Sequence, residues 1–229
     1  MGRGDATYIR IQNQVDVLID AGPNSLITSC LGKHMPFYDR TIEYAILTNV
    51  KKSEYSGYSF LARRYDISHL FVSSPNKVPA SYIRLLKQLT YKGTQIHTVV
   101  DHEEMHLVDA IMTIETDLKR SDETNISMLE PRLTVSLREY DSKVEVIGYN
   151  QTHQADSLLQ QDPVRRLFIK IPEYGLPVGT LTRFLGLAEH ATLLINNTQI
   201  TPDHLQTLNT YSNLSVINMA SGNDIVYRL

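Results

Sequence analysis

The sequence predicts an α/β fold in which two β-sheets pack face to face and helices cover their outer sides. Three observations lead to this prediction. Short apolar runs of strand length recur along all 229 residues, helical patterns separate several of them, and hairpin patterns occur both early and late in the chain. No long Pro/Gly/Ser-rich linker and no internal repeat divides the sequence, so we expect a single domain of residues 1–229.

The first half of the chain reads as a hairpin followed by strand-helix units. Residues 6–22 alternate between apolar and polar side chains, turn near Gln12 to Gln14 and resume as a strand. A short helix is expected at Ser25 to Leu31, with Gly32 as its stop. The units that follow are a buried strand at 42–49, a helical pattern at 56–66, a strand at 69–74 and an amphipathic helix at 81–93 closed by Gly93.

Strand patterns dominate the second half. The residues at 132–148 form the clearest pattern, two alternating runs that predict another hairpin. Further strands are expected at 94–100, 110–116, 166–172, 191–196, 214–218 and 224–229, with helices at 179–188 and 201–211.

The composition places the chain among globular proteins and excludes some kinds of site. Apolar residues make up 42% of the chain and charged residues 21%, and no run approaches the roughly 20 apolar residues of a membrane helix. Cys30 is the single cysteine, which excludes an internal disulfide and a four-cysteine metal site. The net charge of -3 gives no overall attraction to nucleic acid. The basic pairs Lys51/Lys52, Arg63/Arg64 and Arg165/Arg166 are candidates for a local positive face, although scattered pairs are more often solvated surface.

Residues 102–106 read His-Glu-Glu-Met-His, which matches the zinc-protease pattern His-Glu-x-x-His. That chemistry requires a helix, because only a helix places His102 and His106 on one face beside Glu103. The segment lies between two strand patterns and lacks an apolar helical face, so we interpret it as an exposed hairpin end. The other histidines, among them His69, show no spacing typical of metal ligands and are expected to be surface or hydrogen-bonded residues.

Five short stretches, taken in order, resemble one family. They are GRGDATYIR, VLIDAGP, LGKHMPFYDRTIEYAILT, KIPEYG and SVINMASGNDIVYRL, and together they span nearly the whole chain. Their order and residues resemble the metallo-β-lactamase-like domain of ComEC-type competence (DNA internalisation) proteins. The resemblance implies a metallo-β-lactamase-like αββα four-layer sandwich. It also implies a domain excised from a longer membrane protein, located at the extracytoplasmic face of a bacterial membrane.

The resemblance also identifies where metal ligands would lie. In active relatives the strand ending in Ile-Leu-Thr is followed by His-x-His-x-Asp-His, which holds two zinc ions. Alignment on that motif places four other residues, Asn49, Lys51, Ser53 and Glu54, at the ligand positions. The family's later Gly-Asp and His-His steps read Gly148-Tyr149 and Glu173-Tyr174. Glu54 alone of the first four is a ready zinc ligand, and the Lys51 ammonium opposes a dication because it offers no lone pair.

These substitutions predict a metal-free, non-catalytic module with no cofactor, which binds single- or double-stranded DNA or supports the channel of its parent membrane protein. Lys51, Lys52, Tyr55 and Tyr58 are the candidates for a nucleic-acid surface, because basic and aromatic side chains contact phosphates and stack on bases. Core-boundary tyrosines are the simpler interpretation of Tyr55 and Tyr58. Three alternatives stay open at this point. One is a single metal held by Glu54 and Glu173 with Tyr149 or a histidine; the others are an active metal-dependent phosphodiesterase that degrades the non-imported strand, and a protein-docking module.

Overall fold

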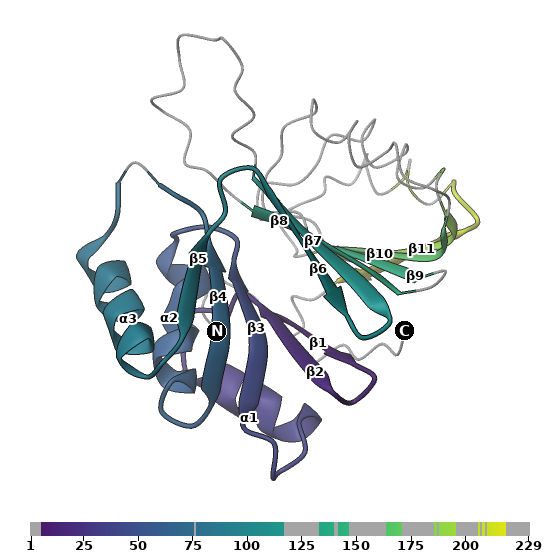
Figure 1. The fold of residues 1–229 in the computed structure, drawn as a ribbon. Coiled ribbons are helices and arrows are strands. Elements are labelled where there is room, and N and C mark those ends of the chain that lie inside the picture. The colour runs from purple at the N-terminus through teal and green to yellow at the C-terminus, as the bar shows by residue number, and fades with distance from the viewer. Residues whose placement is uncertain are drawn as a thin grey trace, which may run out of the picture. The chain divides into compact units, whose positions relative to one another are not determined.

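The structure, a computed structural model, describes residues 6–75, 77–116, 133–139, 142–146, 164–170, 186, 188–195, 206, 208 and 210–218. It contains two β-sheets with helices, which confirms the expected α/β class and the two sheets (Figure 1). The chain divides into two compact units, the first comprising residues 1–103 and 114–133 and the second residues 104–113 and 134–229. Among the described residues, no helix has both the length and the apolar character needed to cross a membrane. The single domain of residues 1–229 stays a prediction.

The first unit is built on a five-stranded sheet with the order β1-β2-β3-β4-β5. The expected hairpin is confirmed: β1 and β2 are antiparallel, and positive φ angles of 46° at Gln12 and 58° at Asn13 close the turn. The next three strands each run parallel to the preceding one, so the carboxyl ends of β2 to β5 share one edge of the sheet. The strands are β1 (Thr7–Ile11), β2 (Val15–Ile19), β3 (Thr41–Leu47), β4 (Asp66–Val72) and β5 (Gln95–Thr98).

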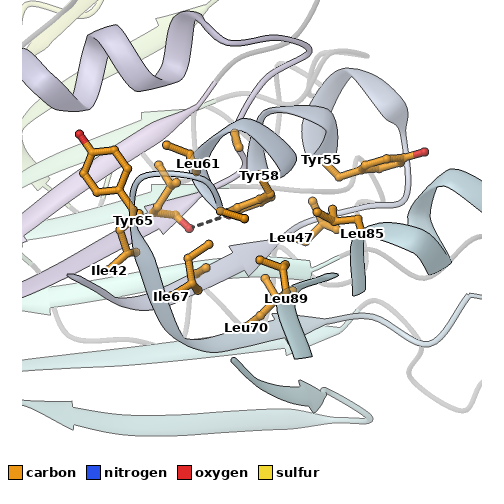
Figure 2. Packing of buried hydrophobic residues seen from close by; sticks show 14 of the residues in the cluster. Ile42, Leu47, Tyr55, Tyr58, Leu61, Tyr65, Ile67, Leu70, Leu85 and Leu89 are labelled. Carbon is orange, nitrogen blue, oxygen red and sulfur yellow. Dashed lines mark hydrogen bonds between the residues drawn. The ribbon is translucent and has the colours of Figure 1, made fainter. Parts of the chain in front are cut away.

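Three helices, α1 (Leu26–His34), α2 (Lys52–Leu61) and α3 (Ala80–Tyr91), belong to this unit. Their apolar faces and the strands share one cluster of buried side chains, part of which Figure 2 shows. Tyr58 and Leu61 of α2 pack there with Leu70 of β4 and with Leu85 and Leu89 of α3. Burial of this many apolar side chains, at roughly 1.5–3 kcal/mol for each large one, provides most of the stabilisation of the unit.

The helix boundaries correct two expectations. Gly32 does not stop α1, which continues to His34. The helix ends instead at Met35, whose ψ of 145° is extended, because the residue before a proline is sterically excluded from the helical region and Pro36 follows. The second helix begins at Lys52, ahead of the expected range 56–66. The third is confirmed, and Gly93 follows it with a φ of 97° that favours glycine.

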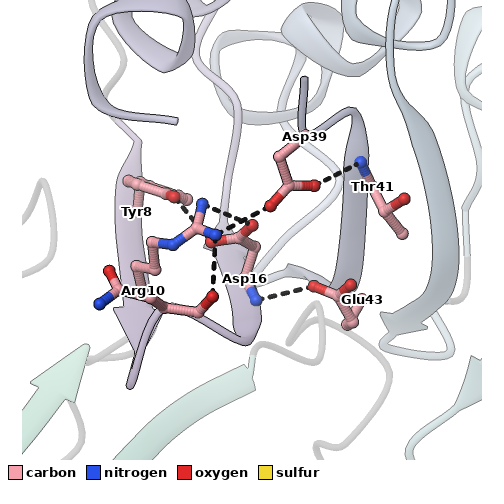
Figure 3. Close-up of polar contacts among 7 residues, drawn as sticks. Tyr8, Arg10, Asp16, Asp39, Thr41 and Glu43 are labelled. Atoms are coloured by element: carbon pink, nitrogen blue, oxygen red, sulfur yellow. Dashed lines mark hydrogen bonds and ion pairs between the residues drawn. The ribbon is translucent and has the colours of Figure 1, made fainter. Parts of the chain in front are cut away.

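A polar cluster ties β1, β2 and the segment before β3 together (Figure 3). The Tyr8 hydroxyl donates to Asp16 Oδ1 at 2.7 Å, and Arg10 binds Asp16 Oδ2 at 3.2 Å and Asp39 Oδ2 at 2.9 Å. The Asp16 backbone N–H donates to Glu43 Oε2 at 2.7 Å. Asp16 is only 1% exposed, and burial raises the pKa of its carboxyl group to about 6. Asp16 is therefore a buried carboxyl group whose two oxygens are bound by Tyr8 and Arg10.

The second sheet has seven strands in the order β12-β11-β10-β9-β8-β7-β6. β8 and β9 form the expected antiparallel hairpin, whereas β9, β10, β11 and β12 are mutually parallel. The predicted helices at 179–188 and 201–211 lie largely outside the described residues, and the predicted strand at 224–229 lies entirely outside them. The strands are β6 (His102–Leu107), β7 (Ala110–Thr116), β8 (Leu133–Glu139), β9 (Ser142–Val146), β10 (Val164–Lys170), β11 (Ala188–Ile195) and β12 (Leu214–Asn218).

Candidate functional site

The segment between β3 and α2 lies at the carboxyl edge of the five-stranded sheet, where ligands of open α/β sheets usually bind. Asn49 shapes this turn, because its Oδ1 accepts the backbone N–H of Lys51 at 2.8 Å and its Nδ2 donates to Thr48 Oγ1 at 3.2 Å. Lys51 is the extended N-cap residue of α2, with φ −76° and ψ 137°, and has no side-chain cap hydrogen bond. The turn and the first turn of α2 thus contain all four positions aligned with the first metal motif.

Asp20, directly after β2, holds the end of β3 in place. Its Oδ1 accepts the Thr48 backbone N–H at 2.9 Å, its Oδ2 accepts the Thr48 hydroxyl at 2.8 Å, and its own N–H donates to Ile46 O at 2.9 Å. Asp20 has a φ of 56°, which aspartate tolerates better than most residues. Our reading of the sequence assigned no role to Asp20. The available signal was an Asp-Ala-Gly step directly after an apolar strand.

The start of α2 packs directly against the chain after β2. Ala21 N donates to Glu54 O at 2.8 Å, and Gly57 N donates to Gly22 O, also at 2.8 Å. A Cβ atom at Gly57 would lie 1.9 Å from the Ala21 carbonyl oxygen, so only glycine permits this approach. These backbone contacts therefore help to position the turn that would carry the ligands.

The donor set at the four aligned positions does not fit a dinuclear zinc centre. The Asn49 oxygen accepts the Lys51 N–H, and the Ser53 hydroxyl donates to Glu54 Oε1 at 3.3 Å. A protonated Lys51 has no lone pair to give a metal. Glu54, 7% exposed, is the one residue of the four with a strong zinc-binding group. In the part of the chain that the structure describes, no three His, Cys, Asp or Glu side chains are grouped to hold a metal ion.

Of the four nucleic-acid candidates, the structure leaves only the lysines accessible. Lys52 is exposed and Lys51 half-buried. Tyr58 is 0% exposed, and its hydroxyl donates to Leu18 O and Ile46 O at 3.1 and 3.0 Å. Tyr55 is 3% exposed, and its ring packs edge-on to that of Tyr82. The prediction that Tyr55 and Tyr58 stack on bases is therefore wrong, because both residues lie on the face of α2 that packs into the core.

Burial has a second effect on Tyr58. It raises the pKa of the phenol well above the usual value, and the negative charge of Asp20 raises it further. Tyr58 consequently stays a neutral hydrogen-bond donor to the two strand carbonyls. It is a structural residue beneath the turn.

The remaining predicted positions are distributed as follows. Tyr149, Glu173 and Tyr174 lie outside the described residues. His102 to His106 belong to strand β6, which excludes the helical zinc-protease arrangement and agrees with our hairpin interpretation. His69 is hydrogen-bonded as expected: its Nδ1 lies 3.0 Å from Nε2 of His97.

Comparison with known proteins identifies the fold. No protein-family model matches the chain, and no curated protein sequence matches it. Among solved structures, Zn²⁺-bound PqqB from Methylobacterium extorquens superposes with a TM-score of 0.59 at 11% identity, covering 93% of this chain and 84% of that one. The metallo-β-lactamase fold protein YhfI from Bacillus subtilis gives 0.57 at 11% identity, with 91% and 85% covered. A diphosphatase from the PhnP family gives 0.53 at 14% identity, with 92% and 79% covered. The chain therefore has the metallo-β-lactamase fold, and at these identities the likeness shows the fold alone.

Proposed function

We propose that this chain is a metal-free, non-catalytic metallo-β-lactamase-like module of a ComEC-type DNA-uptake protein. The observation that carries the proposal is the residue set of the β3–α2 turn, where Asn49, Lys51 and Ser53 occupy positions that resemble zinc-ligand positions. Because the described residues include no grouped set of ligands, we expect no activation of water for hydrolysis at this turn. The turn and its supporting contacts persist because they also form the core.

The chemistry of the turn suits an anion better than a cation. Lys51 and Lys52 place two ammonium groups at the start of α2. The first N–H groups of a helix lack partners within the helix, and its dipole favours negative charge at that end. A phosphate of single- or double-stranded DNA fits this environment, and no metal or small-molecule cofactor is required.

The cellular setting follows from the resemblance of the five sequence stretches. The partners we propose are DNA and the remainder of a parent membrane protein. The location we propose is the extracytoplasmic face of a bacterial membrane. Within that setting the module binds the incoming DNA or supports the external face of the channel.

Metal content and DNA binding test the proposal together. Protein purified without added metal should contain zinc and manganese far below one ion per chain. It should bind DNA with an affinity that falls steeply with salt. The double change Lys51→Glu and Lys52→Glu should reduce the affinity for DNA about tenfold or more, because each lost phosphate contact weakens binding to a similar degree for all DNA sequences. A charge-matched control reverses two basic residues of α3, Arg84→Glu and Lys87→Glu, and should change the affinity little. Near-stoichiometric metal would contradict the proposal that the module is metal-free. Absence of DNA binding at low salt would contradict the proposal that it binds DNA.

One observation favours the rival hydrolase. Glu54 is a buried carboxylate at the position of the last aligned ligand, and carboxylates bind zinc and manganese. Turnover of DNA on addition of Mn²⁺ or Zn²⁺, abolished by Glu54→Gln, would establish a phosphodiesterase in place of the non-catalytic module. We expect no such turnover.

A further inference from the structure

The amino-terminal edge of the five-stranded sheet carries a second surface. Because β3, β4 and β5 are parallel, the connections that precede them meet at the edge opposite the β3–α2 turn. A hydrogen bond of 2.8 Å from Asp66 N to Arg40 O joins the first two connections. Figure 1 shows the connection from α1 to β3 projecting beyond the lower ends of the strands.

Two aromatic side chains lie in this projecting connection. Phe37 is 85% exposed and Tyr38 76% exposed. Their rings pack edge to face, with centroids 5.4 Å apart and an interplanar angle of 82°. Neither ring contributes to the buried core of the unit. Two adjacent rings exposed to water would gain free energy if an apolar partner buried them.

Basic residues surround the aromatic pair. Lys33 and Arg40 are exposed on either side of it in sequence, and Arg63 and Arg64 are exposed in the neighbouring connection. The acids on this edge have basic partners: Arg10 binds Asp39 at 2.9 Å, and Lys92 lies 3.8 Å from Asp66. This edge is therefore locally positive although the whole chain carries a net charge of -3.

We propose that Phe37 and Tyr38 insert into the interfacial region of a lipid bilayer, with Lys33, Arg40, Arg63 and Arg64 contacting anionic headgroups. Apolar side chains flanked by Lys and Arg are typical of surfaces that lie on membranes. Tyrosine suits the headgroup level because its ring is apolar and its hydroxyl polar. We call this set of six residues the interfacial edge.

The ring geometry favours a bilayer over single-stranded nucleic acid. Successive bases stack on protein rings whose faces follow the strand, whereas two rings at 82° present faces in perpendicular directions. Insertion of apolar rings into a bilayer imposes no such orientation on them.

The proposed function supplies the membrane setting, but the interfacial edge is separate from the turn proposed to bind DNA. Reversal of Lys51 and Lys52 tests DNA binding alone, and changes at Phe37 and Tyr38 test membrane binding alone. Failure of one proposal is therefore distinguishable from failure of the other.

Because the chain contains no tryptophan, a single introduced tryptophan reports on one position. Phe37→Trp should show an emission maximum shifted to the blue on addition of phosphatidylglycerol/phosphatidylcholine vesicles. The matched control is Val100→Trp, a position 75% exposed just after β5, at the opposite edge. Its emission should not change. Equal shifts at both positions, or none at Phe37→Trp, would overturn the proposal.

Vesicle co-sedimentation of the whole chain provides the second measurement. The double change Phe37→Ser and Tyr38→Ser should lower binding at least tenfold without altering the circular dichroism spectrum, because neither ring is in the core. Arg63→Glu with Arg64→Glu should weaken binding to anionic vesicles more than to purely zwitterionic ones. Unchanged vesicle binding in the serine variant would overturn the proposal. Quenching of Phe37→Trp by oligothymidylate without any response to vesicles would do so as well, and would assign the surface to nucleic acid.

Discussion

The close packing of α2 against the chain after β2 makes a prediction about two glycines that differ only in their surroundings. Gly32 lies within α1 and Gly57 within α2. Alanine is preferred over glycine in helices by about 1 kcal/mol, so helix propensity alone predicts that both Gly→Ala changes stabilise the protein. No heavy atom lies within 4 Å of a Cβ added at Gly32, whereas a Cβ at Gly57 would lie 1.9 Å from Ala21 O, 2.7 Å from Ala21 C and 2.9 Å from Ala21 Cβ.

The magnitude at Gly57 follows from what must move. Reaching an ordinary contact requires α2 and Ala21 to separate by roughly 1.5 Å, an overpacking that costs about 1–3 kcal/mol. The separation also stretches the hydrogen bonds from Ala21 N to Glu54 O and from Gly57 N to Gly22 O, each contributing about 1 kcal/mol. After the gain in helix propensity, Gly57→Ala should lower the free energy of unfolding by about 2–4 kcal/mol.

Urea denaturation followed by circular dichroism measures both variants. Gly32→Ala should raise the free energy of unfolding by about 0.5–1 kcal/mol and shift the urea midpoint slightly upward. Gly57→Ala should shift the midpoint strongly downward. If Gly57→Ala proved as stable as Gly32→Ala, α2 would not approach Ala21 as closely as described. The account of how the turn is positioned would then fail.

Three further predictions concern buried polar groups. Asp20→Asn should lower the free energy of unfolding, measured in urea, by about 1–3 kcal/mol, because an amide has only one oxygen to accept the two hydrogen bonds from Thr48. Thr48→Val should then cost less stability in the Asp20→Asn variant than in the wild type. Fully additive losses of stability would contradict the coupling between the two residues. Burial raises the pKa of Asp16 from 3.8 to about 6, so the folded state binds the proton more tightly. The wild type should accordingly lose stability as the pH rises from 4 to 6, relative to Asp16→Asn, and parallel pH profiles of the two proteins would refute this. Tyr58→Phe should cost about 1 kcal/mol and leave DNA affinity unchanged, whereas weaker DNA binding at equal stability would restore Tyr58 as a contact residue.

Local patterns were sufficient to predict much of the fold. The first hairpin and α3 were predictable because their periodicity and their turn residues, such as Gly93, act over a few positions. Gly32 was misread because a glycine tolerated inside a helix and a glycine that ends one look alike in sequence. The early start of α2 was missed because its first residues, Lys52 to Glu54, are polar and give no apolar periodicity.

The candidate site was predictable only in part, because its supports are distant in sequence. The resemblance placed Asn49, Lys51 and Glu54 on one turn, and the structure agrees that they lie between β3 and α2 or at its start. The bond between Asp20 and Thr48 joins residues 28 positions apart, so no local pattern reveals it. Burial of Tyr55 and Tyr58 was likewise decided by which face of α2 meets the sheet, a tertiary choice.

The contacts that hold the two sides of the turn are made by residues outside positions 49, 51 and 53. Asp20 fixes Thr48, Gly57 allows α2 to reach Ala21, and Tyr58 bonds the strand carbonyls beneath. None of these contacts needs an ion, so they do not depend on which side chains stand at positions 49, 51 and 53. Likeness of fold to Zn²⁺-bound PqqB therefore carries no information about metal in this chain. A backbone superposition does not read side chains, so the metal content of the purified protein decides the matter, and the ammonium group of a protonated Lys51 predicts that this content is low.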